Sequence, residues 1–174
     1  QLSEQSFASA DPNFFEMFSI PLLEGDAQNC LQDKSNIVIS KKLAEAYFKG
    51  ESPVGKHISL HYESYRLEFL VSGVFEDFPQ QSSIRFDMLI PIENLEAFYG
   101  EAMNDWGNTW FVTYIELDDQ SDIGQFQQKI EKLPTDKAGM EWYDLTIQKF
   151  GDQYLFDQFK NGVQSGGRID TLIL

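Results

Sequence analysis

Residues 50–56 are the part of the chain that most resembles a motif with a chemical role. They read Gly-Glu-Ser-Pro-Val-Gly-Lys, which fits the glycine and lysine spacing of a phosphate-binding loop. That loop requires a Ser or Thr at the next position to hold magnesium, and this chain has His57 there. It also requires a strand before it and a helix after it, whereas the local sequence predicts the reverse. We therefore interpret the segment as a turn from a helix to a strand.

Side chains that could bind a metal or act as acid and base are present but unfavourably spaced. On one strand, His57 and His61 would lie about 13 Å apart, too far to share a metal ion. The carboxylate pairs Glu76-Asp77 and Asp118-Asp119 fall in predicted turns after strands and match no calcium loop. The signatures of serine hydrolases, zinc proteases and thiol redox sites are all missing. We expect no catalytic residue, no cofactor and no metal site, with a carboxylate hydrolase as an open alternative.

Aromatic residues are concentrated between residues 106 and 114. Trp110, Val112 and Tyr114 alternate as expected for one face of a strand, so we expect them to pack in the core. Trp106 lies in the loop Asn-Asp-Trp-Gly-Asn of residues 104–108. It is our candidate for an exposed contact with a partner or a ligand.

Cys30 is the single cysteine of the chain. A lone thiol can form neither an internal disulfide nor a cysteine-based zinc site. We interpret Cys30 as a small, partly buried apolar residue. The sequence leaves any further role of Cys30 open, together with the redox compartment.

The charge balance of the 174 residues excludes some classes of partner. The chain contains 13 Lys and Arg residues and 28 Asp and Glu residues, which gives a net charge of −15. Such a chain is unsuited to bind nucleic acid, since phosphate contacts need a cationic surface. The hydrophobic content of 42% is enough for a core and excludes disorder of the whole chain. The chain starts at Gln1 and ends with the apolar residues 171–174, so we expect it to be part of a longer polypeptide.

The order of the predicted elements is that of an α+β protein. Ser40 and Asp122 are typical helix N-caps, and Gly50 and Pro134 are typical of helix ends. Alternating apolar residues predict the strands and a hairpin. We expect helices at 14–18, 41–49, 93–99 and 123–133, strands at 36–39, 57–62, 67–75, 84–90, 110–117 and 143–150, and a flexible linker at 161–167.

Several short sequence motifs, which follow one another in a fixed order, make the chain resemble a known protein family. They include residues 11–18 (Asp-Pro-Asn-Phe-Phe-Glu-Met-Phe), 21–26 (Pro-Leu-Leu-Glu-Gly-Asp), 53–56 (Pro-Val-Gly-Lys), 71–79 (Val-Ser-Gly-Val-Phe-Glu-Asp-Phe-Pro) and the closing 166–168 (Gly-Gly-Arg). In this order they resemble the periplasmic core domain of MacB-like ABC transporter permeases, within the FtsX-type group. The resemblance is weakest between about residues 101 and 151.

The resemblance implies a fold of two small mixed α/β subdomains. Residues 1–34 plus 79–160 would form a porter-like unit from both ends of the domain. Residues 35–78 would form a smaller inserted, Sabre-like unit. Residues 161–174 would be a linker toward a transmembrane helix that lies outside this sequence.

The resemblance also implies a function. The chain would be a non-catalytic periplasmic domain of an inner-membrane permease that transmits ATP-driven motion to the outer side. Its partners would be a cytoplasmic ABC ATPase, a second permease copy, and a periplasmic adaptor or a peptide or lipoprotein substrate. The alternative is a free-standing envelope or secreted domain that binds a ligand through the Trp106 loop. The transported substrate and the oligomeric state of the isolated domain stay open.

Overall fold

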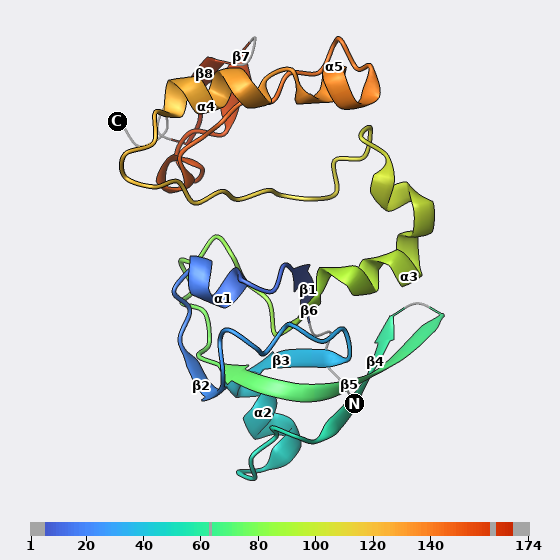
Figure 1. The fold of residues 1–174 in the computed structure, drawn as a ribbon. Coiled ribbons are helices and arrows are strands. Elements are labelled where there is room, and N and C mark those ends of the chain that lie inside the picture. The colour runs from blue at the N-terminus through green and yellow to red at the C-terminus, as the bar shows by residue number, and fades with distance from the viewer. Residues whose placement is uncertain (1–5, 63, 161–162, 169–174) are drawn as a thin grey trace. The chain divides into compact units, whose positions relative to one another are not determined.

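The computed structural model describes residues 6–62, 64–160 and 163–168 (Figure 1). The chain divides into two compact units between Met103 and Asn104. Among the described residues, no helix is long and apolar enough to cross a membrane.

Unit 1 (residues 1–103) is built on one six-stranded mixed sheet. The strand order is β1 (Phe7–Ala10), β6 (Met88–Pro91), β3 (Asn36–Ser40), β5 (Tyr65–Phe75) and β2 (Leu22–Gly25), and β4 (His57–Tyr62) also pairs with β5. The pairs β1–β6 and β3–β5 are parallel, and the others are antiparallel. The prediction of a mixed α/β fold is therefore confirmed.

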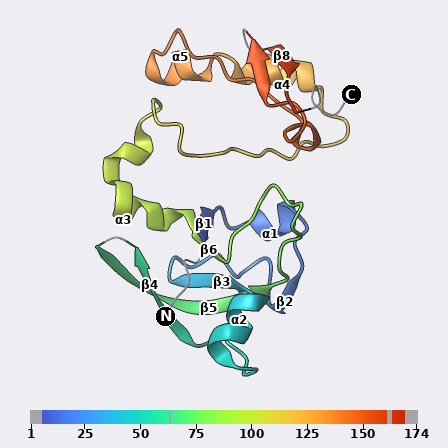
Figure 2. The same cartoon turned by 180° about the vertical axis from the view of Figure 1, so that it is seen from behind.

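Both faces of this sheet are buried at its central strands β3 and β6, which are near-continuous apolar runs. In β3, Ile37 and Ile39 point into one hydrophobic cluster, and Val38 points into the other. Leu43 of helix α2 (Lys41–Phe48) belongs to the first cluster and Phe15 of α1 (Phe14–Met17) to the second. The two helices accordingly lie on opposite faces of the sheet (Figure 2).

Several local predictions for unit 1 are confirmed. The Ser40 hydroxyl accepts the backbone N–H of Leu43 and caps α2, and Lys49 and Gly50 end that helix with positive φ angles. The hairpin forms as β4 and β5. The predicted helix at 93–99 is present as η1 (Ile92–Leu95) and α3 (Glu96–Tyr99), and it continues into η2 (Gly100–Asn104).

Other predictions for unit 1 are corrected by long-range pairing. Strand β2 is not among the strands expected from the sequence, and it exists because β5 supplies its hydrogen-bonding partner. The strand expected at 84–90 begins only at Met88, because residues 84–87 have no place in the ladders of the described residues with β1 and β3.

Unit 2 (residues 104–174) contains α4 (Ile123–Ile130), α5 (Leu133–Ala138), η3 (Phe150–Asp152), β7 (Gln158–Lys160) and β8 (Val163–Gly166). Asp122 caps α4 by accepting the N–H of Gln125, as predicted. Pro134 does not end that helix; it lies in the first turn of α5, where a missing N–H costs nothing.

The strands expected at 110–117 and 143–150 are not formed. A β-prone sequence becomes a strand only where a neighbouring strand provides a hydrogen-bonded ladder, and these segments pair in no ladder of the described residues. Residues 163–166 of the expected linker form β8, which pairs with β7. Residues 161–162 and 169–174 of that linker lie outside the described residues.

The segments assigned to the two predicted subdomains contribute strands to one sheet. Residues 1–34 and 79–160, expected in the porter-like unit, contribute β1, β2 and β6 to the sheet of unit 1. Residues 35–78, expected in the Sabre-like unit, contribute β3, β4 and β5 to the same sheet. The assignment of these segments to two subdomains stays a prediction.

Candidate functional site

The segment that resembles a phosphate-binding loop is a turn between α2 and β4. Gly50 and Gly55 both have positive φ angles, of 87° and 84°, which suit the reversal of the chain. The ammonium group of Lys56 forms an ion pair with Glu51 and lies 5.4 Å from the centre of the Phe48 ring. The lysine that would bind phosphate is thus engaged in the turn, and the interpretation as a turn is confirmed.

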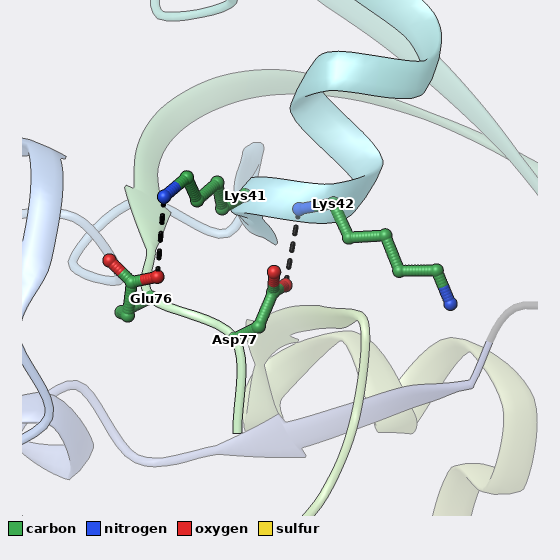
Figure 3. Close-up of polar contacts among 4 residues, drawn as sticks. All are labelled: Lys41, Lys42, Glu76 and Asp77. Carbon is green, nitrogen blue, oxygen red and sulfur yellow. Dashed lines mark hydrogen bonds and ion pairs between the residues drawn. The ribbon is translucent and has the colours of Figure 1, made fainter. Parts of the chain in front are cut away.

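The carboxylates Glu76 and Asp77 hold the start of α2 against the chain that leaves β5 (Figure 3). Asp77 Oδ1 accepts the backbone N–H of Lys42 at 3.1 Å. Glu76 Oε1 lies 3.5 Å from Nζ of Lys41. Both carboxylates therefore have structural partners, and their geometry indicates support of a helix terminus.

The second carboxylate pair stabilises a turn in unit 2. Oδ1 of Asp118 accepts the N–H of Gln120 at 3.0 Å, and its carbonyl oxygen accepts the N–H of Ser121 at 2.8 Å. Across the described residues, no group of three or more His, Cys, Asp or Glu side chains is placed to hold a metal ion.

The two histidines lie on β4 with exposed side chains. In the register of the hairpin, His57 pairs with Leu70 and His61 pairs with Arg66. Their positions are those of surface residues on a strand, as expected from the sequence.

Cys30 is buried in the second cluster, with 2% of its surface exposed. Its thiol lies 3.7 Å from the carbonyl oxygen of Ala27. Burial, with a smaller contribution from the nearby charge of Asp26, raises the pKa of this thiol to about 11. The neutral thiol acts as an apolar packing group, which confirms its interpretation and gives it low reactivity.

Trp106 is presented by a tight turn of the chain. Oδ1 of Asp105 accepts the N–H of Gly107 at 2.8 Å, and the carbonyl oxygen of Asp105 accepts the N–H of Asn108 at 3.0 Å. This arrangement fixes the backbone on both sides of Trp106. The indole is 44% exposed. Trp106 is thus a surface residue, and its contact with a partner or a ligand stays a prediction.

Trp110 and Val112 extend this exposed surface, contrary to their expected burial, whereas Tyr114 is half-buried and packs edge-on against Phe150. Trp110 and Val112 are 54% and 67% exposed, because the strand that would bury them has no partner in the described part of the chain. We call residues 106–115 the aromatic segment. Its exposed large hydrophobic side chains are Trp106, Trp110, Phe111, Val112 and Ile115.

Comparison with known proteins gives one family and a set of related structures. The sequence profile of the MacB-like periplasmic core domain matches residues 2–133. A crystal structure of a domain assigned to a permease protein of Porphyromonas gingivalis shares 26% identity, with a TM-score of 0.66 over 84% of this chain and 70% of that one. The periplasmic region of MacB from Actinobacillus actinomycetemcomitans shares 16% identity, with a TM-score of 0.50 over 79% of this chain and 59% of that one, and shows the same fold. No curated protein matches the sequence significantly.

Proposed function

Because the chain belongs to the MacB-like periplasmic core domain family, we propose that it is the periplasmic domain of an ABC transporter permease. In this role it is non-catalytic and forms the extracytoplasmic part of an inner-membrane protein. It transmits ATP-driven motion outward and contacts a substrate or a partner protein there.

The match of the family profile over residues 2–133 is the observation that carries this proposal. The likeness to a permease domain at 26% identity supports it independently of that profile. The roles of Glu76, Asp77 and Lys56 in the structure also favour it, because the groups that could suggest an enzyme are used in a helix terminus and a turn.

The packing of unit 1 suits the transmission of motion. Its central strands β3 and β6 are buried on both faces, and each face carries its own cluster of hydrophobic side chains. Such close-packed interiors have low compressibility and move as a body rather than deform. A displacement applied to one edge of the sheet would therefore reach the other edge.

The proposed partners follow from the same assignment. Through the membrane part of the permease, the domain is linked to a cytoplasmic ABC ATPase. A second permease copy forms the functional homodimer, and a periplasmic adaptor or a peptide or lipoprotein substrate binds outside the membrane. The exposed indole of Trp106 is the contact residue that we propose on this chain.

The test uses the complete polypeptide that contains this chain, reconstituted in vesicles with its ATPase. Replacing residues 6–168 by a short flexible linker should abolish transport while the ATPase still hydrolyses ATP. The matched control is the intact permease with an ATPase that cannot hydrolyse ATP, which should lose both activities. Transport that persists without residues 6–168 would reject the proposal. A chain found free in the envelope, with no membrane spans on either side, would favour the free-standing ligand-binding domain.

A further inference from the structure

We propose that residues 165–168 form a latch, which fixes the last described part of the chain to the turn of residues 152–157 in unit 2. We call that turn the seat of the latch. This inference rests on the proposed function and deepens it, because in a permease a displacement would reach the domain through the residues that follow Arg168. A docked latch passes this displacement to unit 2.

The seat is a tight turn that is held by its own hydrogen bonds. The carbonyl oxygen of Asp152, at the end of η3, accepts the N–H of Leu155 at 3.1 Å and the N–H of Phe156 at 2.9 Å. The carbonyl oxygen of Phe156 accepts a hydrogen bond from Nε2 of Gln148. The seat therefore presents a fixed stretch of backbone to the residues that contact it.

The glycines of the latch lie close to the backbone of the seat. Gly166 pairs with Gln158 in the ladder of β7 and β8, and Gly167 is buried. A Cβ at position 167 would lie 2.5 Å from the carbonyl oxygen of Leu155 and 2.7 Å from the backbone nitrogen of Asp157. Since no side chain fits at such distances, only glycine allows the two backbones to approach this closely.

The side chain of Arg168 adds two contacts to the same turn. Its guanidinium carbon lies 4.6 Å from the centre of the Tyr154 ring, and its Nε lies 3.9 Å from Oδ2 of Asp157. The side chains of Arg168 and Asp157 are 57% and 49% exposed, so water weakens the ion pair. An exposed cation–π contact is also weak, and the latch is therefore a reversible contact.

The docked latch changes what the linker sequence would do. The composition of residues 161–167 predicts a flexible segment, which takes up a displacement by straightening. In the structure a steric fit, a cation–π contact and an ion pair all join residues 167–168 to one turn. The close fit at Gly167 thus makes the seat the first ordered structure that such a displacement meets.

Trypsin cleavage of the 174-residue chain measures whether the latch is docked. Cleavage after Arg168 requires its side chain to leave Tyr154 and enter the pocket of the protease. Mass spectrometry follows the release of residues 169–174. Cleavage after Lys137, on α5 of the same unit, reports any general loosening of unit 2.

Two substitutions should open the latch without a change of charge. Gly167→Ala should speed cleavage after Arg168 about tenfold, because the added Cβ cannot be accommodated against the seat. Tyr154→Leu removes an exposed ring and should speed it about threefold, from the usual strength of an exposed cation–π contact.

Each substitution has a matched control in unit 2. Gly151→Ala adds a Cβ where no atom lies within 4 Å, and Tyr143→Leu removes another exposed ring. Neither should change the rate of cleavage after Arg168. The latch would be rejected if Gly167→Ala and Tyr154→Leu left that rate unchanged, or if cleavage after Lys137 rose by the same factor.

The role of the latch is tested in the complete permease, reconstituted in vesicles with its ATPase. Gly167→Ala should lower the amount of substrate transported per ATP hydrolysed at least about twofold, while ATP hydrolysis continues. Gly151→Ala should leave this ratio unchanged. An unchanged ratio for Gly167→Ala would show that the latch passes on no displacement and would overturn the proposal.

The outcome is separable from that of the proposed function. If transport depends on residues 6–168 but Gly167→Ala keeps the normal ratio, the role of the latch is wrong and the permease assignment stands. If the trypsin experiment shows a docked latch and transport does not need these residues, the permease assignment is wrong.

Discussion

The start of helix α2 allows a quantitative test of how unit 1 is held together. Two side chains from different parts of the chain satisfy its first N–H groups. The Ser40 hydroxyl accepts the N–H of Leu43 at 3.2 Å in a buried environment, and Asp77 accepts the N–H of Lys42 at 3.1 Å. The neighbouring ion pair of Lys41 joins side chains that are 45% and 46% exposed.

These differences in burial predict a rank order of stability losses. Ser40→Ala leaves a buried N–H without its acceptor and should lower the free energy of unfolding by about 2 kcal/mol. Asp77→Ala removes an exposed acceptor and a charge that favours the helix N-terminus, for a loss of about 1 kcal/mol. Lys41→Met removes only a solvent-exposed ion pair and should cost less than about 0.5 kcal/mol.

Urea unfolding followed by far-UV circular dichroism measures these losses. The urea concentrations at the midpoints of unfolding are compared for variants that share the same dependence of the free energy on urea. Asp77→Asn is the matched control, because it keeps the acceptor oxygen and loses the charge, and it should retain most of the stability. If Lys41→Met proved as costly as Ser40→Ala, the ion pair rather than the caps would hold the helix, and the reasoning would be refuted.

Three further predictions concern the core and the backbone of unit 1. Gly25→Ala should lower the free energy of unfolding by about 3 kcal/mol, because φ is +97° and a Cβ would lie 2.4 Å from a carbonyl oxygen of β5. Gly50→Ala, with φ of +87° and open space around the added Cβ, should cost about 1 kcal/mol. Equal losses of the two variants in urea unfolding would contradict the clash at Gly25. Phe75→Ala, at 0% exposure, should cost about 4 kcal/mol and Tyr47→Ala, at 47% exposure, less than about 1 kcal/mol, as measured by thermal unfolding. The pKa of Cys30 is raised from 9.0 to about 11 in the folded chain, so its neutral thiol contributes stability below pH 9 that is lost as the pH rises toward 11; the unfolding free energy of the native chain should fall more over this range than that of Cys30→Ala, and parallel pH profiles would contradict the shift.

The sequence was sufficient to predict an element where one continuous stretch of chain contains all the residues that determine it. Helix α2 has its cap and its left-handed end within residues 40–50, where Ser40 and Gly50 predict them. The hairpin of β4 and β5 needs only the alternation of its own residues. The order of short phrases along the chain was also enough to identify the family.

The sequence was insufficient where pairing partners are distant. Strand β1 is defined by its parallel register with β6, about 80 residues later, and β2 by its pairing with β5. The capping of α2 by Asp77 joins residues that are 35 positions apart. Nothing local to these residues encodes such contacts.

The aromatic segment also shows this limit of local sequence, because here a strand expected from the sequence does not form. The β-branched and aromatic residues at 110–117 suit a strand, and this is a property of the sequence alone. The residue types around Asp105 likewise indicate a turn. Whether those residues pack or face solvent depends on a neighbouring strand, since both burial and ladder hydrogen bonds require one. Only the tertiary structure decided that Trp110 and Val112 stay exposed beside Trp106, because exposure is a property of what surrounds a side chain and not of the side chain itself.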